Sequence, residues 1–197
     1  GRGAVFTRAG THEMDAAIMD GRDRRAGAVA GICGPRNPVD AARAVMERTS
    51  HVLMAGDGAL TVAREAGLPF EETSYFFTPE RWDTLQETLR MEADGTLDDD
   101  PSRRHGTVGA VARDRAGNLA AATSTGGMTG KRWGRIGDSP IIGAGTYADD
   151  RACAGKQCQE ALAWQVLDRV DVVIGDGPPD AGRTGVVVRG EDQPLVF

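Results

Sequence analysis

The residue pair Gly106-Thr107 could carry nucleophilic chemistry. A polar, charged stretch at about residues 92–106 ends in glycine, and the threonine that follows opens the run TVGAVARD. A threonine hydroxyl is a weak nucleophile until a base takes its proton, and its own α-amino group, with a pKa of about 7.7–8.0, can do so at a chain terminus. This chemistry requires a cut before Thr107, and a preceding glycine permits the bent geometry of the attack. Any threonine that begins a strand after a glycine shows the same pattern, so the pair alone does not decide the function.

The other candidate motifs are weaker. Gly56-x-Gly58 and Gly175-x-Gly177 lack the spacing of phosphate-binding loops and are typical of turns. The sequence contains neither a GxSxG nor an HExxH motif. Three consecutive aspartates at 98–100 are typical of a solvated loop. The histidines show no obvious partners for a Ser-His-Asp set; they are His12, His51 and His105.

A predicted β-hairpin positions Thr107. Its two strands cover residues 107–114 and 118–123, and the turn between them contains Gly117. Both strands consist mainly of small residues, so helices or a second sheet could pack closely on them. The last predicted strand of the chain covers residues 185–189.

The rest of the chain supplies further strands and helices. Residues 4–7 and 12–17 predict an opening hairpin, and residues 27–32 predict a buried strand. Helices are predicted where an Asn or Thr cap precedes a proline or where apolar residues recur at helical spacing. Two helices are predicted to begin at Asn37-Pro38 and Thr78-Pro79. Two others are predicted to cover residues 59–66 and 157–170. Hairpins without strict strand-helix alternation predict an α/β or α+β sandwich with a mainly antiparallel sheet.

Length and charge exclude several classes of protein. The chain has 197 residues, a net charge of −6 and no apolar run near the ~18 residues that a membrane-spanning helix needs. The acidic balance argues against a nucleic-acid binder, because phosphate contacts need clustered positive charge. Too few cysteines are present for a disulfide framework and none has zinc-site spacing, which predicts packing thiols in a reducing cytoplasm; they are Cys33, Cys153 and Cys158.

Two long runs resemble one enzyme family. They are HGTVGAVARDRAGNLAAATSTGGMTGKRWGRIGDSPIIGAGTYADD and, upstream, GRGAVFTRAGTHEMDAAIMDGRDRRAGAVAGICGPRNPVDAARAVMERTSHVLMAGDGA. GTVGAV, TSTGGM and GRIGDSP, in this order and spacing, resemble the plant-type asparaginase and isoaspartyl peptidase family of N-terminal nucleophile hydrolases. The resemblance implies an αββα sandwich with two mainly antiparallel sheets between helical layers. It also implies self-cleavage between Gly106 and Thr107 into an α subunit (residues 1–106) and a β subunit (residues 107–197) of one composite domain.

The resemblance assigns roles to individual residues. Thr107 matches the nucleophile, and Thr125 matches a threonine that hydrogen-bonds it. Arg135 matches the arginine that pairs with the substrate α-carboxylate, and Asp138 matches the aspartate that receives the α-ammonium group. The implied reaction is hydrolysis of L-asparagine and β-aspartyl (isoaspartyl) dipeptides through a β-aspartyl ester, with backbone N–H groups holding the oxyanion.

The resemblance also bears on cofactors and partners. It implies no required cofactor and no catalytic metal, while allowing a structural sodium ion. It implies amino-acid or dipeptide substrates and a homodimer of precursors that becomes (αβ)2. Composition, rather than the resemblance, predicts a cytoplasmic location without nucleic-acid or membrane partners. A glycosylasparaginase-like hydrolase, suggested by the GDSPI and AGTYADD runs, is one alternative, and an uncleaved, inactive homologue is another.

The resemblance weakens beyond the YAD motif. The family carries a Gly/Thr-rich segment of the type TGTGE there, which supplies oxyanion and substrate contacts, and it has no counterpart after Ala154. The family's N-terminal HGGAG strand has no counterpart either. We therefore expect this sequence to be part of a longer chain.

Overall fold

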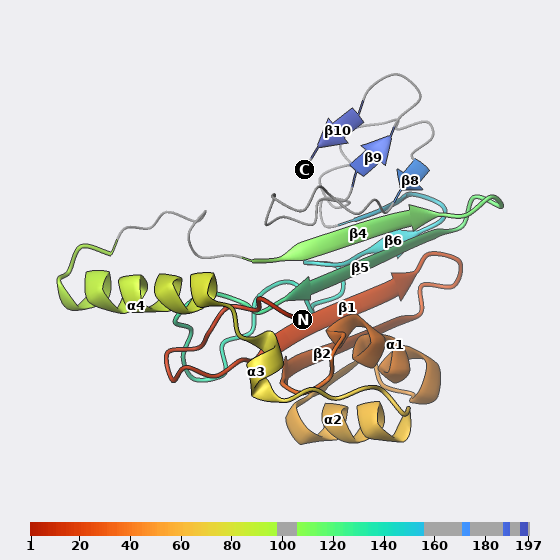
Figure 1. Ribbon diagram of the computed structural model, residues 1–197. Coiled ribbons are helices and arrows are strands. Elements are labelled where there is room, and N and C mark those ends of the chain that lie inside the picture. The colour runs from red at the N-terminus through yellow and green to blue at the C-terminus, as the bar shows by residue number, and fades with distance from the viewer. Residues whose placement is uncertain (98–105, 156–170, 174–186, 190–193, 197) are drawn as a thin grey trace.

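A five-stranded mixed sheet forms the centre of the molecule (Figure 1). The structure is a computed structural model that describes residues 1–97 and 106–155 and three short strands beyond them. The strand order is β3-β2-β1-β5-β4, and all neighbours are antiparallel except β2 and β3. The strands are β1 (Met14–Asp20), β2 (Ala26–Ile32), β3 (Leu53–Ala55), β4 (Val108–Arg113) and β5 (Leu119–Thr125).

Two helices cover half of one face of this sheet. α1 (Pro38–Arg48) packs on β1 and β2, and α2 (Gly56–Glu65) packs on α1 and β2 (Figure 1). Their buried apolar side chains join those of the sheet in one hydrophobic core. Gly27 permits the close approach of β2 and α1, because a Cβ there would lie 2.1 Å from the backbone oxygen of Ala42. The β2-α1-β3 unit is a single parallel crossover in an otherwise antiparallel sheet.

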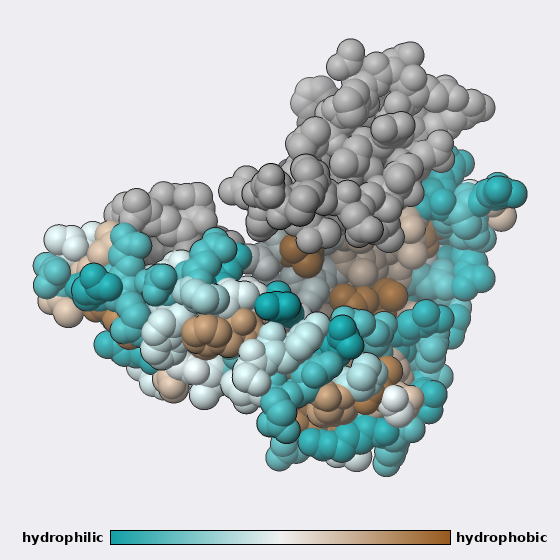
Figure 2. All heavy atoms as spheres, viewed as in Figure 1, coloured by the Kyte–Doolittle hydropathy of each residue, from teal (hydrophilic) through white to brown (hydrophobic). Residues whose placement is uncertain are grey.

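The half of this face over β5 and β4 is not covered by α1. Val108 is 53% exposed, and Ala110 and Ala122 beside it are half-buried. Figure 2 shows hydrophobic residues gathered beside the hydrophilic surface near α1 and α2.

The predicted helix starts are confirmed, although their caps differ. α4 (Pro79–Ala93) begins after Thr78, whose hydroxyl accepts the backbone N–H of Arg81 at 3.4 Å. At α1, Asn37 occupies the N-cap position but makes no capping hydrogen bond. A short helix, α3 (Thr73–Phe76), precedes α4.

The β4–β5 hairpin forms where the sequence predicts it. The carboxylate of Asp114 accepts the backbone N–H groups of Ala116 and Asn118, both at 2.9 Å, and Gly117 adopts a φ of +92°. These bonds close the turn and pair the two strands in register.

Small sheets lie outside the central one. β6 (Ala148–Asp149) pairs with β7 (Cys153–Ala154), and Ala148 packs against Met19 and Ala121 in a second hydrophobic core. These two side chains point away from α1, because side chains alternate along a strand. A further sheet has the order β10-β9-β8; its strands are β8 (Asp171–Val173), β9 (Val187–Arg189) and β10 (Pro194–Val196).

The coarse fold prediction is confirmed, since helices and a mainly antiparallel sheet form an α/β structure. The opening hairpin is wrong. Its turn forms, with the N–H of Thr7 donating to the backbone oxygen of Thr11 at 2.8 Å, but both edges of β1 are occupied by β2 and β5. The prediction of three packing thiols fails at Cys153, which forms a disulfide, whereas Cys33 is free. The helix predicted at 157–170 lies outside the described residues.

Candidate active site

Three side chains line up across three strands at one end of the sheet. Asp15 of β1 is the strand partner of Thr125 of β5. Val108 of β4 is the partner of Ser124, so Thr107, one residue earlier, lies beside Thr125. Because side chains alternate along strands, all three share the face opposite α1.

The hydroxyl groups of Thr107 and Thr125 are hydrogen-bonded. Oγ1 of Thr107 donates to Oγ1 of Thr125 at 3.1 Å, and the same acceptor receives the backbone N–H of Gly127 at 2.9 Å. Thr125 is 4% exposed, whereas Thr107 is exposed. A buried hydroxyl thus holds an accessible one, although the catalytic roles of both stay predictions.

Two glycines allow a sharp turn after Thr125. A Cβ on Gly126 would lie 2.6 Å from the backbone nitrogen of Val5, so no larger residue fits. Gly127 has a φ of +86°, a conformation that favours glycine. The turn directs the N–H of Gly127 back at the threonine hydroxyl.

The predicted cleavage position is surrounded by distant segments. A Cβ on Gly106 would lie 3.4 Å from Nη2 of Arg81 in α4 and 3.7 Å from Cγ1 of Val5. Nε of Arg81 in turn donates to the backbone oxygen of Gly3 at 3.2 Å. The N-terminal segment and α4 therefore lie beside Gly106.

The loop that carries Arg135 and Asp138 is anchored to β5. The hydroxyl of Thr123 donates to the backbone oxygen of Ser139 at 2.7 Å, and the hydroxyl of Thr146 donates to the same oxygen at 3.2 Å. Ser139 and Thr146 are buried, whereas Arg135 and Asp138 are exposed. The anchor strand is the one that ends at the candidate site, so the two exposed charges lie on a loop held next to it.

Asp15 and Lys131 also belong to this region, and sequence reasoning missed both. Asp15 is fully buried, and burial raises the pKa of its carboxyl group. The positive charge of Arg135 acts against this rise. One signal was available, since Asp15 interrupts the small apolar residues of β1, MDAAIMD. The sequence alone does not reveal that this face of the strand is covered.

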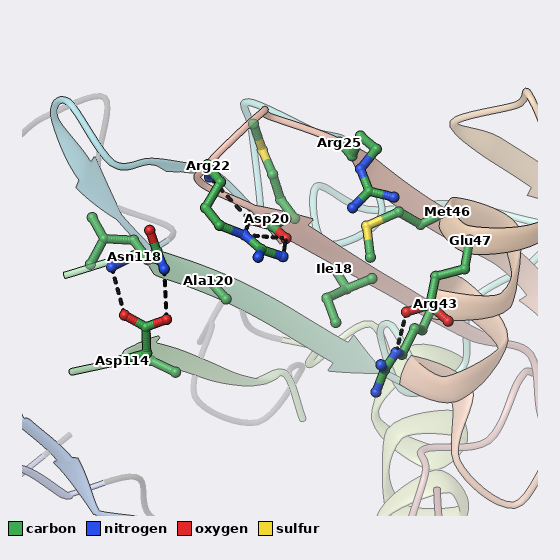
Figure 3. Close-up of a pocket in the computed structure, with 13 residues that line it drawn as sticks. Ile18, Asp20, Arg22, Arg25, Arg43, Met46, Glu47, Asp114, Asn118 and Ala120 are labelled. Carbon is green, nitrogen blue, oxygen red and sulfur yellow. Dashed lines mark hydrogen bonds and ion pairs between the residues drawn. The ribbon is translucent and has the colours of Figure 1, made fainter. Parts of the chain in front are cut away.

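The pocket in Figure 3 lies at the opposite end of the sheet. It lies between β1, α1 and the β4–β5 turn, and Asp114 lines it. Its charges neutralise one another, because Arg22 pairs with Asp20 and Arg43 pairs with Glu47. None of the predicted site residues is among the described residues that line this pocket, so it is not the candidate site.

Two observations concern metal-binding clusters and His12. Within residues 1–97 and 106–155, no cluster of His, Cys, Asp or Glu is suited to a metal ion. His12 is buried against Phe6, with ring centroids 4.2 Å apart, which is typical of core packing. None of the helices described here is long and apolar enough to span a membrane.

Known proteins are similar to most of this chain. The isoaspartyl peptidase of Salmonella typhimurium is 53% identical over 159 residues, which are 78% of this chain and 50% of that protein. The isoaspartyl peptidase/L-asparaginase of Mus musculus is 48% identical over 150 residues (76% and 45%). The plant-type L-asparaginase of Pyrococcus abyssi is 45% identical over 165 residues (80% and 53%). The chain thus spans about half the length of the curated relatives it matches.

A family model described as asparaginase matches residues 1–156, a range that contains every predicted site residue. The match ends close to the point where the resemblance was expected to weaken. The match to the family model confirms the resemblance inferred from GTVGAV, TSTGGM and GRIGDSP. The chain therefore belongs to the asparaginase family.

Proposed function

We propose that this chain is part of an amidohydrolase that matures by self-cleavage and hydrolyses L-asparagine and β-aspartyl dipeptides. One observation carries the proposal: the hydroxyl of Thr107, directly after a glycine, lies 3.1 Å from the buried hydroxyl of Thr125. Family membership and the names of the relatives support the same reaction.

Self-cleavage begins with attack of Oγ1 of Thr107 on the carbonyl carbon of Gly106. A C–O bond forms, the peptide C–N bond breaks, and the hydroxyl proton passes to the leaving nitrogen. Water then hydrolyses the ester, which leaves a carboxylate on Gly106 and a free α-amino group on Thr107. The products are the α subunit, residues 1–106, and the β subunit, residues 107–197.

In the mature enzyme, the new α-amino group is the general base. It takes the hydroxyl proton of Thr107 while Oγ1 attacks the amide or β-peptide carbonyl of the substrate. Ammonia or an amine leaves with a proton, and water hydrolyses the β-aspartyl ester. Thr125 orients the attacking oxygen, whose misplacement by about 1 Å can cost about 100-fold in rate.

Arg135 and Asp138 hold the α-carboxylate and the α-ammonium group of the substrate in this proposal. Both are exposed on the loop that Ser139 and Thr146 fasten to β5. A guanidinium group can bind a carboxylate through two parallel hydrogen bonds, which orients the substrate as well as attracting it.

Several finer expectations belong to the same proposal. They are a four-layer αββα sandwich, a homodimer that matures to (αβ)2, a cytoplasmic location, and catalysis without a required cofactor, with a structural sodium ion allowed. The sheet with α1 and α2 on one face supports the first, because it supplies one sheet layer and part of one helical layer.

A denaturing gel of the purified full-length protein tests the proposal. We expect two fragments, one of which begins with Thr107 by N-terminal sequencing, and release of ammonia from asparagine. The Thr107→Ala variant should remain one inactive band. A wild-type protein that never splits and releases no ammonia contradicts the proposal. Asparagine, an isoaspartyl dipeptide and a glycosylated asparagine, compared side by side, then rank the substrates.

A further inference from the structure

We propose that the buried Asp15, together with Lys131, is a positioning element that holds the turn after Thr125 and, through it, the hydroxyl of Thr107. The inference rests on the proposed function, because it concerns how that nucleophile is aimed. Both residues act through Thr125 and are therefore positioning residues.

The carboxylate of Asp15 lies next to Thr125 inside the protein. The two residues are strand partners on adjacent strands and share a face. Oδ1 of Asp15 accepts the backbone N–H of Gly31 at 2.9 Å. That N–H is available because the register of β2 shifts between the partners of Met14 and Ala16. Oδ2 of Asp15 is buried and has no hydrogen-bond partner among the described residues.

Lys131 ties the loop after β5 to the start of β1. Its side chain is 1% exposed, and Nζ donates to the backbone oxygen of Glu13 at 2.8 Å and lies 3.7 Å from the Glu13 carboxylate. The same side chain covers Gly127, where a Cβ would lie 3.0 Å from Cδ and 3.1 Å from Nζ of Lys131. The lysine therefore packs on the turn whose N–H holds Thr125.

Asp15 and Lys131 act on the same two segments, because Asp15 is the strand partner of Thr125 while Lys131 bonds Glu13 and packs on Gly127. Burial raises the pKa of Asp15 most strongly and the charge of Glu13 adds to this, whereas the N–H of Gly31 and the charges of Lys131 and Arg135 lower it. A buried carboxylate with an unsatisfied oxygen costs free energy, and an uncharged side chain would fill the same space at lower cost. The charge of Asp15 therefore adds to that of Glu13 in attracting the ammonium group of Lys131, whose side chain packs over Gly127.

Asp15→Asn in the full-length protein is the first test, with Asp20→Asn as the matched control. Asparagine keeps the acceptor for the N–H of Gly31 but removes the charge. Asp20 is on the same strand and is ion-paired with the exposed Arg22. We expect D15N to show native circular dichroism while self-cleavage and kcat fall by about 10-fold to 100-fold with little change in KM. D20N should match the wild type.

Lys131→Met tests the other partner. It should slow self-cleavage to a similar extent, and D15N/K131M should be no slower than the slower single variant, because the two residues act as one unit. Additive losses, wild-type rates in folded D15N, or wild-type rates in folded K131M would each overturn the inference. If D15N does not fold, K131M decides the question alone.

The same experiment separates the two proposals. A wild type that splits and releases ammonia, beside variants with wild-type rates, removes the positioning role and leaves the hydrolase intact. A wild type that does neither removes the hydrolase itself.

Discussion

Asp15 and Asp20 lie near opposite ends of β1, and they differ in burial and in the hydrogen bonds that their carboxylates accept. Asp15 is fully buried, and one of its oxygens has no partner among the described residues. Asp20 receives Nε–H of Arg22 on both oxygens, at 3.0 and 3.1 Å (Figure 3). The hydrogen bond from Arg22 lowers the pKa of Asp20, whereas burial raises that of Asp15.

The difference supports the placement of the proposed site at the Asp15 end of the sheet. An exposed ion pair contributes little, typically about 0–1 kcal/mol, because water and salt screen it. A buried carboxylate with an unmet acceptor lowers stability, so its position beside Thr125 and Thr107 calls for a compensating role. The end of the sheet that carries Asp20 and its ion pair with Arg22 holds a pocket, but Thr107 and Thr125 lie at the other end.

Apart from the complete loss expected in Thr107→Ala, the largest effect is expected at Thr125. Thr125→Val keeps the volume but removes the oxygen that receives the hydroxyl of Thr107 and the N–H of Gly127. Self-cleavage and kcat should therefore fall about 100-fold or more. Fragment appearance on gels and ammonia release measure this. Thr125→Ser keeps the hydroxyl and should recover most of the rate, and wild-type rates in the valine variant would refute the orienting role.

Substitutions at two glycines of β2, one near each end of the strand, should lower the free energy of unfolding by different amounts. Gly27→Ala should destabilise by about 1–3 kcal/mol or more through overpacking, because its Cβ would lie 2.1 Å from the backbone oxygen of Ala42. Gly31 has a φ of +63° and no described atom within 4 Å of an added Cβ, so Gly31→Ala should cost about 1–2 kcal/mol of backbone strain. Urea unfolding compares the two. A larger loss in G31A would mean that the contact between β2 and α1 is looser than the structure shows.

A substitution at Arg135 should weaken substrate binding without affecting self-cleavage. Arg135→Lys keeps the charge but loses the planar fork, so kcat/KM should fall about 10-fold, mainly through KM. Self-cleavage involves no substrate and should be unchanged. Arg132→Lys, on the same loop and ion-paired with Glu92, is the control and should behave as the wild type. An equal loss in both variants would remove the specific role of Arg135.

The pH dependence of stability should have opposite signs at the two aspartates. The pKa of the Asp15 carboxyl group is raised in the folded protein. The contribution of Asp15 to stability is therefore present below pH 3.8 and is lost as pH rises through the folded-state pKa. The pKa of Asp20 is lowered, so its contribution is present above 3.8 and is lost as pH falls. As pH rises, D15N should gain stability relative to the wild type and D20N should lose it. Urea unfolding over a pH series checks this, and slopes of the same sign would contradict the comparison.

The smallest effect is expected from Asp20→Asn at neutral pH. Removing an exposed, screened ion pair should lower the free energy of unfolding by less than about 1 kcal/mol. The difference from the wild type should shrink in high salt, because salt screens exposed charges. Thermal unfolding at low and high salt measures both. A large, salt-independent loss would show that Asp20 is not merely a surface partner of Arg22.

Local signals predicted the local structure well. Thr78 and Pro79 marked the first turn of α4, and Gly117 marked the turn of the β4–β5 hairpin, because such signals act within a few residues. The opening hairpin failed for the complementary reason. Its turn formed, but β2 and β5 took both edges of β1, and no turn signal reports which strands compete.

Contiguous motifs were enough to identify the family and to name Thr107, Thr125, Arg135 and Asp138 as candidates, because the chemistry of each follows from its residue type. The position of Asp15 beside Thr125 emerged from the fold alone, because the register between β1 and β5 joins residues that are remote along the chain. Burial, which sets the energetic cost of a charge, likewise depends on the distant segments that pack over it.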